Sequence, residues 1–225
     1  MKRLIVSYLV ICSTIPVFAQ QPGWDSTHRP GNFQQKVEQF KSYPNSKKDI
    51  IFFGNSITAG TDWSELLSLP YARNRGISGD ITFGLLERLE EVTEGKPAKV
   101  FILIGINDIS RNIPDSFILR NYRWIIQRIK KESPATKIYF QTLLPVNNEY
   151  TRFPNHYNKD EHILYINSEL KKMGAAENIV VIDLYPHFLN AVNKLEKKYT
   201  DDGLHLNIEG YRVWKEVLQK GGYLK

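Results

Sequence analysis

Short apolar runs alternate with stretches of helical periodicity over most of this chain. The runs span four to six residues, which is typical of buried strands rather than of buried helices. They predict five strands, at Ile50–Phe53, Tyr71–Asn74, Val100–Ile104, Ile138–Leu143 and Ile179–Leu184. The helical stretches predict helices at Trp63–Leu69, Phe83–Val92, Phe117–Glu132, His162–Met173, Phe188–Leu195 and Ile208–Lys220. This order predicts an α/β fold, in which helices cover both faces of a parallel sheet and ligands bind at the carboxyl ends of the strands.

The first 48 residues follow a different pattern. Residues 1–19 open with Lys2 and Arg3, continue as an uncharged, mainly apolar run and end in "VFA", the pattern of a cleavable export signal. The apolar run is too short for a comfortable membrane span. Residues 20–48 are expected to form an extension with one helix in "NFQQKVEQFKSYP", before a single domain at residues 49–225. We therefore expect an extracytoplasmic protein, periplasmic or secreted, with no stable membrane span after the signal is removed.

Composition narrows the functional classes. The formal net charge is +6, and removal of Lys2 and Arg3 with the export signal would lower it to +4. This mild basicity, without a stripe of Arg and Lys interleaved with aromatic residues, argues against nucleic-acid binding. The one cysteine, Cys12, lies inside the export signal, so we expect no thiol nucleophile, disulfide or cysteine metal site in the mature chain.

The stretch "IIFFGNSITAG" brings a serine to the end of a predicted strand. Ser56 would stand where the first strand ends and a helix begins, and backbone N–H groups at such a place attract negative charge. Taken alone, Gly, Asn and Ser here are ordinary turn and cap residues. The polar groups at the other strand ends must therefore decide whether Ser56 is a nucleophile.

Two more strand ends carry hydrogen-bond donors. Gly79 lies in "NRGISGD" after the second strand and offers an unshielded N–H, while Asn107 lies in "IGIND" after the third and offers a side-chain amide. With the N–H of Ser56 they make three donors, the arrangement that an oxyanion requires. Each has an ordinary alternative, because Gly79 also suits a plain turn and Asn107 a loop residue that bonds its own backbone.

A histidine and two acids lie together in "TDDGLHLNIEGY", just before the last predicted helix. A serine hydroxyl needs a histidine to take its proton, and an acid best fixes the tautomer of that histidine. His205 and Asp202 could supply both groups, although Asp201 competes for the acid role. The other histidines are expected to be surface or packing residues: His28, His156, His162 and His187.

These motifs resemble, in order and spacing, the four blocks of the SGNH (GDSL-type) serine hydrolase superfamily: "GNSIT", "GISGD", "GIND" and "DGLH". The resemblance covers about Asp49 to Tyr211. It implies a three-layer α/β/α sandwich with a flavodoxin-like, five-stranded parallel sheet. It differs at Asn55, where the commonest family motif has aspartate; asparagine keeps a hydrogen-bonding carbonyl there but no charge.

The resemblance also implies a serine esterase that needs no metal and no cofactor. Ser56 would be the nucleophile, His205 the general base and Asp202 the acid that orients it, which decides against Asp201. The oxyanion hole would be formed by three donors, from Ser56, Gly79 and Asn107.

The expected substrate is a short-chain acyl ester, an acetyl ester on carbohydrate above all. Trp63 near the first strand end, with Asn147 and Tyr150 after the fourth strand, offers aromatic faces and amide groups that suit a sugar ring. The same loop adds Asn148, Arg152, Phe153 and Tyr157. No long insertion is available to build an apolar acyl tunnel. The alternatives are a lipid acyl hydrolase, such as a lysophospholipase or thioesterase, and a non-catalytic glycan-binding module.

Overall fold

The computed structural model describes residues 23–225, so the export signal expected at residues 1–19 lies outside the described residues. The strands are β1 (Ile50–Gly54), β2 (Ala72–Gly76), β3 (Lys99–Leu103), β4 (Lys137–Gln141) and β5 (Val180–Ile182). The helices are α1 (Phe33–Lys41), α2 (Ser56–Ala59), α3 (Trp63–Leu67), α4 (Thr82–Glu87), α5 (Glu90–Thr93), α6 (Ile106–Ser110), α7 (Asp115–Glu132), α8 (Asp160–Ala176), η1 (Tyr185–Phe188), η2 (Lys197–Tyr199) and α9 (Ile208–Lys220). All five predicted strands are present.

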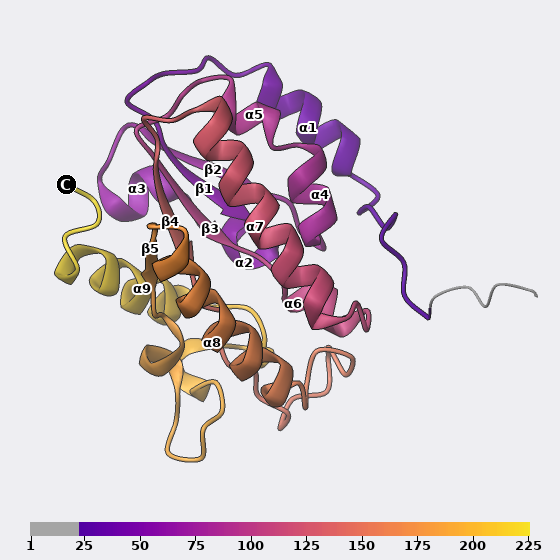
Figure 1. The fold of residues 1–225 in the computed structure, drawn as a ribbon. Coiled ribbons are helices and arrows are strands. Elements are labelled where there is room, and N and C mark those ends of the chain that lie inside the picture. The colour runs from indigo at the N-terminus through magenta and orange to yellow at the C-terminus, as the bar shows by residue number, and fades with distance from the viewer. Residues whose placement is uncertain (1–22) are drawn as a thin grey trace, which may run out of the picture.

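The sheet is parallel throughout, with the strand order β2-β1-β3-β4-β5 (Figure 1). This is the flavodoxin-like order, in which the chain winds outward from β1 in both directions and ligands bind at the carboxyl ends of the central strands. β1 and β3 are buried along their whole length, as expected for parallel strands covered on both faces. The predicted α/β fold with a five-stranded parallel sheet is confirmed.

Alternate side chains of each strand pack against helices on opposite faces of the sheet. Phe52 of β1 stacks on Trp63 of α3 with ring centroids 3.8 Å apart, and Trp63 meets Trp214 of α9 on the same face. Phe53 lies under the guanidinium of Arg88 on the other face, where α4 packs against α7 and α7 against α8. Because successive strand residues point to opposite faces, the two apolar surfaces form the α/β/α sandwich of Figure 1.

Two of the predicted helices differ in the structure. Residues 188–195 form no α-helix, because the chain turns back so that Leu189 and Leu195 pair in an antiparallel bridge. Asn190 holds this turn, since its Oδ1 accepts hydrogen bonds from the N–H groups two and four residues further on. Asparagine side chains compete with helical hydrogen bonds in this way. The helix predicted at Phe83–Val92 is present as two shorter helices, α4 and α5.

The N-terminal extension contains α1, which lies beside the edge strand β2. Phe33, Val37 and Phe40 of α1 form a small apolar cluster with Ile77, separate from the main core. The Arg75 guanidinium of β2 lies 5.0 Å from the centre of the Phe40 ring. These contacts hold the extension against the sheet, close to the carboxyl end of β2.

Candidate active site

A continuous hydrogen-bonded chain joins Ser56, His205 and Asp202. His205 Nε2 lies 2.9 Å from Ser56 Oγ, and His205 Nδ1 lies 2.8 Å from Asp202 Oδ2. A carboxylate only accepts hydrogen bonds, so Nδ1 carries the proton and Nε2 is free to accept from the serine hydroxyl. The structure thus brings the three residues together in the geometry that activates a serine nucleophile.

The end of β1 delivers Ser56 to this chain. Asn55 caps α2, because its Oδ1 accepts a hydrogen bond of 3.0 Å from the Ile57 N–H. Asn55 is fully buried, and its Nδ2 has no hydrogen-bond partner among residues 23–225. Ser56, the first residue of α2, is only partly buried, and its N–H makes no hydrogen bond within the described chain. The Asn55 oxygen therefore helps to fix the backbone at the serine.

The turn that carries Asp202 is organised around its carboxylate. Oδ1 accepts hydrogen bonds from the N–H groups of Leu204 at 3.0 Å and His205 at 2.8 Å. Burial alone would raise the pKa of the Asp202 carboxyl, but the hydrogen bonds from His205 and Leu204 outweigh burial and lower the pKa. Asp201, by contrast, is exposed and its carboxylate lies 3.4 Å from Asn207. The geometry therefore favours Asp202 as the partner of His205.

Gly79 occupies a turn that suits glycine alone. The Asp80 N–H donates to the Ile77 carbonyl at 3.1 Å, and Gly79, the third residue of this turn, has a φ of +81°. Side chains rarely tolerate this left-handed conformation. The Gly79 N–H makes no hydrogen bond within the described residues, and a Cβ at this position would lie 3.4 Å from the ring of Pro30. Gly79 thus leaves its N–H available beside the N-terminal extension.

Asn107 lies in α6, directly after β3. Its Nδ2 donates to the Asp80 carbonyl at 2.9 Å, and its Oδ1 lies 3.0 Å from His156 Nε2. An amide nitrogen has two hydrogens, so one remains for a ligand. The three donors expected around an oxyanion therefore lie in the segments that follow β1, β2 and β3, which are neighbours in the sheet.

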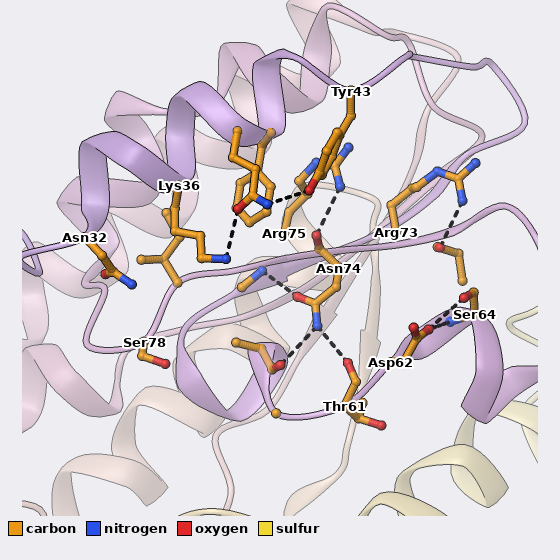
Figure 2. Close-up of a pocket in the computed structure, with 17 residues that line it drawn as sticks. Asn32, Lys36, Tyr43, Thr61, Asp62, Ser64, Arg73, Asn74, Arg75 and Ser78 are labelled. Carbon is orange, nitrogen blue, oxygen red and sulfur yellow. Dashed lines mark hydrogen bonds between the residues drawn. The ribbon is translucent and has the colours of Figure 1, made fainter.

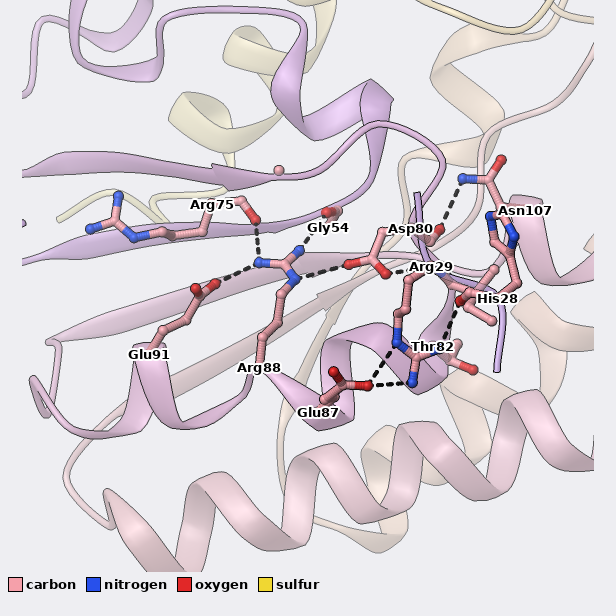
Figure 3. Close-up of polar contacts among 12 residues, drawn as sticks. His28, Arg29, Gly54, Arg75, Asp80, Thr82, Glu87, Arg88, Glu91 and Asn107 are labelled. Atoms are coloured by element: carbon pink, nitrogen blue, oxygen red, sulfur yellow. Dashed lines mark hydrogen bonds and ion pairs between the residues drawn. The ribbon is translucent and has the colours of Figure 1, made fainter. Parts of the chain in front are cut away.

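A buried charged cluster braces two of these loops (Figure 3). The guanidinium of Arg88 pairs with Asp80 at 2.9 Å and Glu91 at 2.6 Å, and it donates to the carbonyls of Gly54 and Arg75 at 2.9 and 3.0 Å. All three charged side chains are fully buried. Burial raises the pKa of Glu91 to about 7 and also raises the pKa of Asp80, although Arg88 favours the charged form of both. One cation thus ties the end of β1 to the turn at Gly79.

Asp108 anchors α6, and with it Asn107, to the start of α4. Its carboxylate accepts hydrogen bonds from the Thr82 N–H at 3.0 Å and the Thr82 hydroxyl at 2.6 Å. Asn121 of α7 donates to the same hydroxyl at 2.8 Å. Complete burial raises the pKa of Asp108 to about 7, even though the bonds from Thr82 favour the ionised form. The one sign in the sequence that Asp108 anchors α6 is its position directly after Asn107.

The loop after β4 forms a wall of the site. The Phe153 ring lies edge-on to the His205 imidazole, with ring centres 5.0 Å apart. The Tyr157 hydroxyl donates to the Asp202 carbonyl at 2.5 Å and accepts from the Phe153 N–H at 3.1 Å. This loop is therefore tied to the turn that carries Asp202 and His205. His156, in the same loop, is partly buried and its Nε2 lies 3.0 Å from Asn107 Oδ1, a contact that the sequence did not indicate.

The structure corrects the expected substrate contacts. Trp63 is 1% exposed, stacks in the core and donates its Nε1–H to the Thr58 carbonyl, so it does not line an open site. Asn147 is fully buried, and its Nδ2 donates to the Leu195 carbonyl. Both residues support loops of the site from within. Tyr150 is partly buried with its ring packed against Gly203, and its substrate role stays a prediction.

A polar cleft of about 770 Å³ lies between α1 and the α2–α3 loop, along the edge strand β2 (Figure 2). Two of its lining residues are close in sequence to residues of the site. Ala59 ends the helix that Ser56 begins, and Ser78 precedes Gly79. Side chains with hydrogen-bonding groups dominate the lining: Asn32, Lys36, Gln39, Tyr43, Thr61, Asp62, Ser64, Arg73, Asn74 and Arg75.

Neither a membrane-spanning helix nor a metal-binding cluster is found in the described part of the chain. Between residues 23 and 225, every helix is too short or too polar to cross a membrane. Over the same residues, no three His, Cys, Asp or Glu side chains are grouped so that they could hold a metal ion.

Comparison with known proteins identifies several relatives. Platelet-activating factor acetylhydrolase IB subunit alpha2 of Rattus norvegicus is 27% identical over 169 residues, covering 72% of this chain and 71% of that protein. N-acylneuraminate cytidylyltransferase of Escherichia coli is 27% identical over 190 residues, or 81% of this chain, but the chain spans only 42% of that protein.

Solved structures share the fold. A protein of Streptococcus pneumonia, described as a platelet activating factor, matches with a TM-score of 0.77 and 30% sequence identity. The match covers 86% of this chain and 92% of that protein's chain. An acetyl xylan esterase matches with a TM-score of 0.64 and 25% sequence identity, over 77% of this chain and 98% of the esterase chain. The model of the GDSL-like Lipase/Acylhydrolase family matches residues 52–213, most of the chain. The protein therefore belongs to the GDSL-like lipase/acylhydrolase family.

Proposed function

We propose that this acylhydrolase removes short acyl groups, acetyl above all, from carbohydrate esters by a serine acyl-enzyme mechanism. The observation that carries the proposal is the hydrogen-bonded chain from Ser56 Oγ through His205 to Asp202. Ser56 is the nucleophile, His205 the general base and Asp202 the residue that orients it. The Ser56 and Gly79 N–H groups and the Asn107 amide form the oxyanion hole.

The reaction then has two halves. Ser56 Oγ attacks the ester carbonyl carbon while His205 Nε2 takes the hydroxyl proton, and the three donors stabilise the oxyanion that forms. The bond to the alcohol breaks as His205 returns the proton to the leaving oxygen. Water next attacks the acyl-enzyme with His205 again as base, which releases the acid and restores Ser56.

The surroundings of the site favour a small acyl group on a polar alcohol. Phe153 stands close to His205 on one side, and Pro30 lies near Gly79 on the other. The cleft beyond Ser78 is lined by charged and hydrogen-bonding side chains together with apolar surface, a mixture that suits the hydroxyl groups and the faces of a sugar ring. Two relatives are named for acetyl esters, an acetylhydrolase and an acetyl xylan esterase, and their names support the same acyl group.

A series of p-nitrophenyl esters tests the acyl preference. We expect the acetate to be cleaved with the highest kcat/KM, followed by the butyrate, with the octanoate and palmitate far behind. The reason is that the Phe153 ring lies close to His205 and the Pro30 ring close to Gly79, which favours a short acyl chain. Acetylated oligosaccharides would be the next substrates to assay. Highest activity on the octanoate or palmitate would replace this proposal with a lipid acyl hydrolase.

Replacement of Lys36 tests whether the polar cleft binds the alcohol part of the substrate. Lys36 lines the cleft from α1, so we expect Lys36→Ala to raise KM for an acetylated oligosaccharide by about fivefold, the loss of roughly one hydrogen bond. Hydrolysis of p-nitrophenyl acetate should not change. Lys41→Ala is the matched control, because Lys41 lies on the same helix and pairs with Glu90 outside the cleft. Equal KM values for all three proteins would place the sugar elsewhere.

We also propose that the protein is exported through the segment at residues 1–19. The supporting pattern is the pair of basic residues, the apolar run and the small residues before the cut. N-terminal sequencing of the protein recovered from outside the cytoplasm would test it, and an N-terminus that retains Lys2 and Arg3 would contradict it.

A further inference from the structure

The orientation of the Asn107 amide is determined by its neighbours. The Asp80 carbonyl can only accept a hydrogen bond, so the atom 2.9 Å from it must be Nδ2. Oδ1 therefore faces His156 Nε2 at 3.0 Å. Because Oδ1 can only accept, His156 must carry a proton on Nε2. The donor and acceptor roles of both side chains follow from this one backbone carbonyl.

We propose that His156 is a positioning residue for the oxyanion hole. It holds the Asn107 side chain so that the free Nδ2 hydrogen points at the developing oxyanion, and it does not touch the reacting atoms. This inference rests on the proposed function, because it assigns Asn107 to the oxyanion hole. The Nε2 hydrogen of His156 is committed to Asn107, so this nitrogen cannot take a proton from Ser56 or from water.

The loop around His156 is built to hold it. The His156 N–H donates to the Phe153 carbonyl at 2.9 Å, and the Phe153 ring meets the His156 imidazole edge-on, 5.8 Å between centres. Tyr157, the next residue, is buried and bonded to the Asp202 carbonyl. A single loop therefore contacts both halves of the machinery, the oxyanion donor Asn107 and the acid Asp202.

His156 keeps one charge state over the pH range in which His205 has to act as a base. Burial, with a smaller contribution from the nearby His205, lowers the pKa of His156 to about 4. Arg111 and Lys159 act in the same direction, while Asp202 opposes them. Above about pH 5 the imidazole is neutral and still donates from Nε2. The bond to Asn107 is thus unaffected by pH during turnover.

A double-mutant cycle tests this role. Asn107→Ala should lower kcat by about 10²–10³-fold, the usual loss for one oxyanion donor. His156→Ala should lower kcat by about 10-fold with KM nearly unchanged, because it loosens the donor without removing it. Adding His156→Ala to Asn107→Ala should cost nothing more, since the residue that His156 positions is already gone.

Two further variants separate positioning from a loss of packing. His156→Gln retains an amide donor and should recover most of the activity, whereas His156→Phe fills the space without a donor and should stay slow. His162→Ala is the control, because His162 is exposed and bonded to Asp115 away from the site, and its activity should be that of the parent. Circular dichroism and melting curves would show that each variant is folded.

The results that overturn the inference are specific. Multiplicative losses in the double variant, or equal activity for His156→Gln and His156→Phe, would mean that His156 does not act through Asn107. These failures leave the proposed function intact if Ser56→Ala is inactive. An active Ser56→Ala variant would instead overturn the proposed function itself.

Discussion

Alanine in place of Ser56 should leave a folded protein whose kcat on p-nitrophenyl acetate is about 10⁶-fold lower, as when a serine protease loses its nucleophile. The change removes the one oxygen that attacks the ester, while Asn55 continues to cap α2 through its own side chain. Fold stability should therefore be preserved. Activity is best followed with enzyme from an expression host that lacks background esterases, and a variant as active as the parent would exclude Ser56 as the nucleophile.

Asp202 and the neighbouring Asp201 offer a matched pair of variants. Asp202→Asn should lower kcat by about 10⁴-fold, because an amide no longer holds His205 in the tautomer that accepts from Ser56. Asp201→Asn, one residue away, should be as active as the parent, since its carboxylate does not contact His205. A similar loss in both variants would indicate a general disturbance of the turn rather than a role for Asp202.

Removal of the buried cation at position 88 should have the largest effect on stability. Arg88→Met leaves Asp80 and Glu91 buried without their partner, and such a change costs about 3–5 kcal/mol. Urea denaturation would measure the loss. Arg212→Met is the control, because Arg212 forms an exposed pair with Glu209, and exposed pairs contribute about 0–1 kcal/mol. A cost below 1 kcal/mol for Arg88→Met would contradict a bracing role.

The loss in Arg88→Met should also depend on pH. Burial already raises the pKa of both carboxyls, to about 7 for Glu91, and loss of the cation removes the charge that opposes this rise. A carboxyl whose pKa is raised in the folded state does not destabilise the fold while it is protonated, at pH values below its unfolded pKa near 4. As the pH rises toward 7 and above, the buried carboxyl has to ionise and the free energy of unfolding falls. The variant should therefore lose less stability at pH 5 than at pH 8. Adding Asp80→Asn and Glu91→Gln should remove this dependence.

The sheet could be predicted from the sequence because its strands are short apolar runs separated by strong helical patterns. Helix ends and loops were harder to predict from the sequence than the strands. Residues 188–195 have helical spacing of apolar side chains, yet the side chain of Asn190 captures the backbone and forms a turn. Such competition depends on local hydrogen bonds that spacing does not reveal.

The candidate site was predictable to the extent that its residues stand at strand ends. Ser56, Gly79 and Asn107 follow three neighbouring strands, so a parallel sheet brings them together whatever their distance in sequence. Burial was not predictable from residue type, since aromatic and amide side chains suit both a sugar site and a core. Trp63 and Asn147 turned out to lie in the interior. His156 was missed because its partner, Asn107, lies 49 residues away and no local motif connects the two.

The position of β2 has a consequence for association between copies of the protein. β2 is an edge strand, hydrogen-bonded to β1 alone, and its free side faces the cleft, with α1 on the other side of that cleft and Phe40 in contact with Arg75 (Figure 2). An uncovered edge strand is a template for pairing with another chain. The N-terminal extension narrows access to this edge, so we expect a fragment that begins at Asp49 to pair with other molecules of its own kind through Ala72–Gly76 more readily than the full chain.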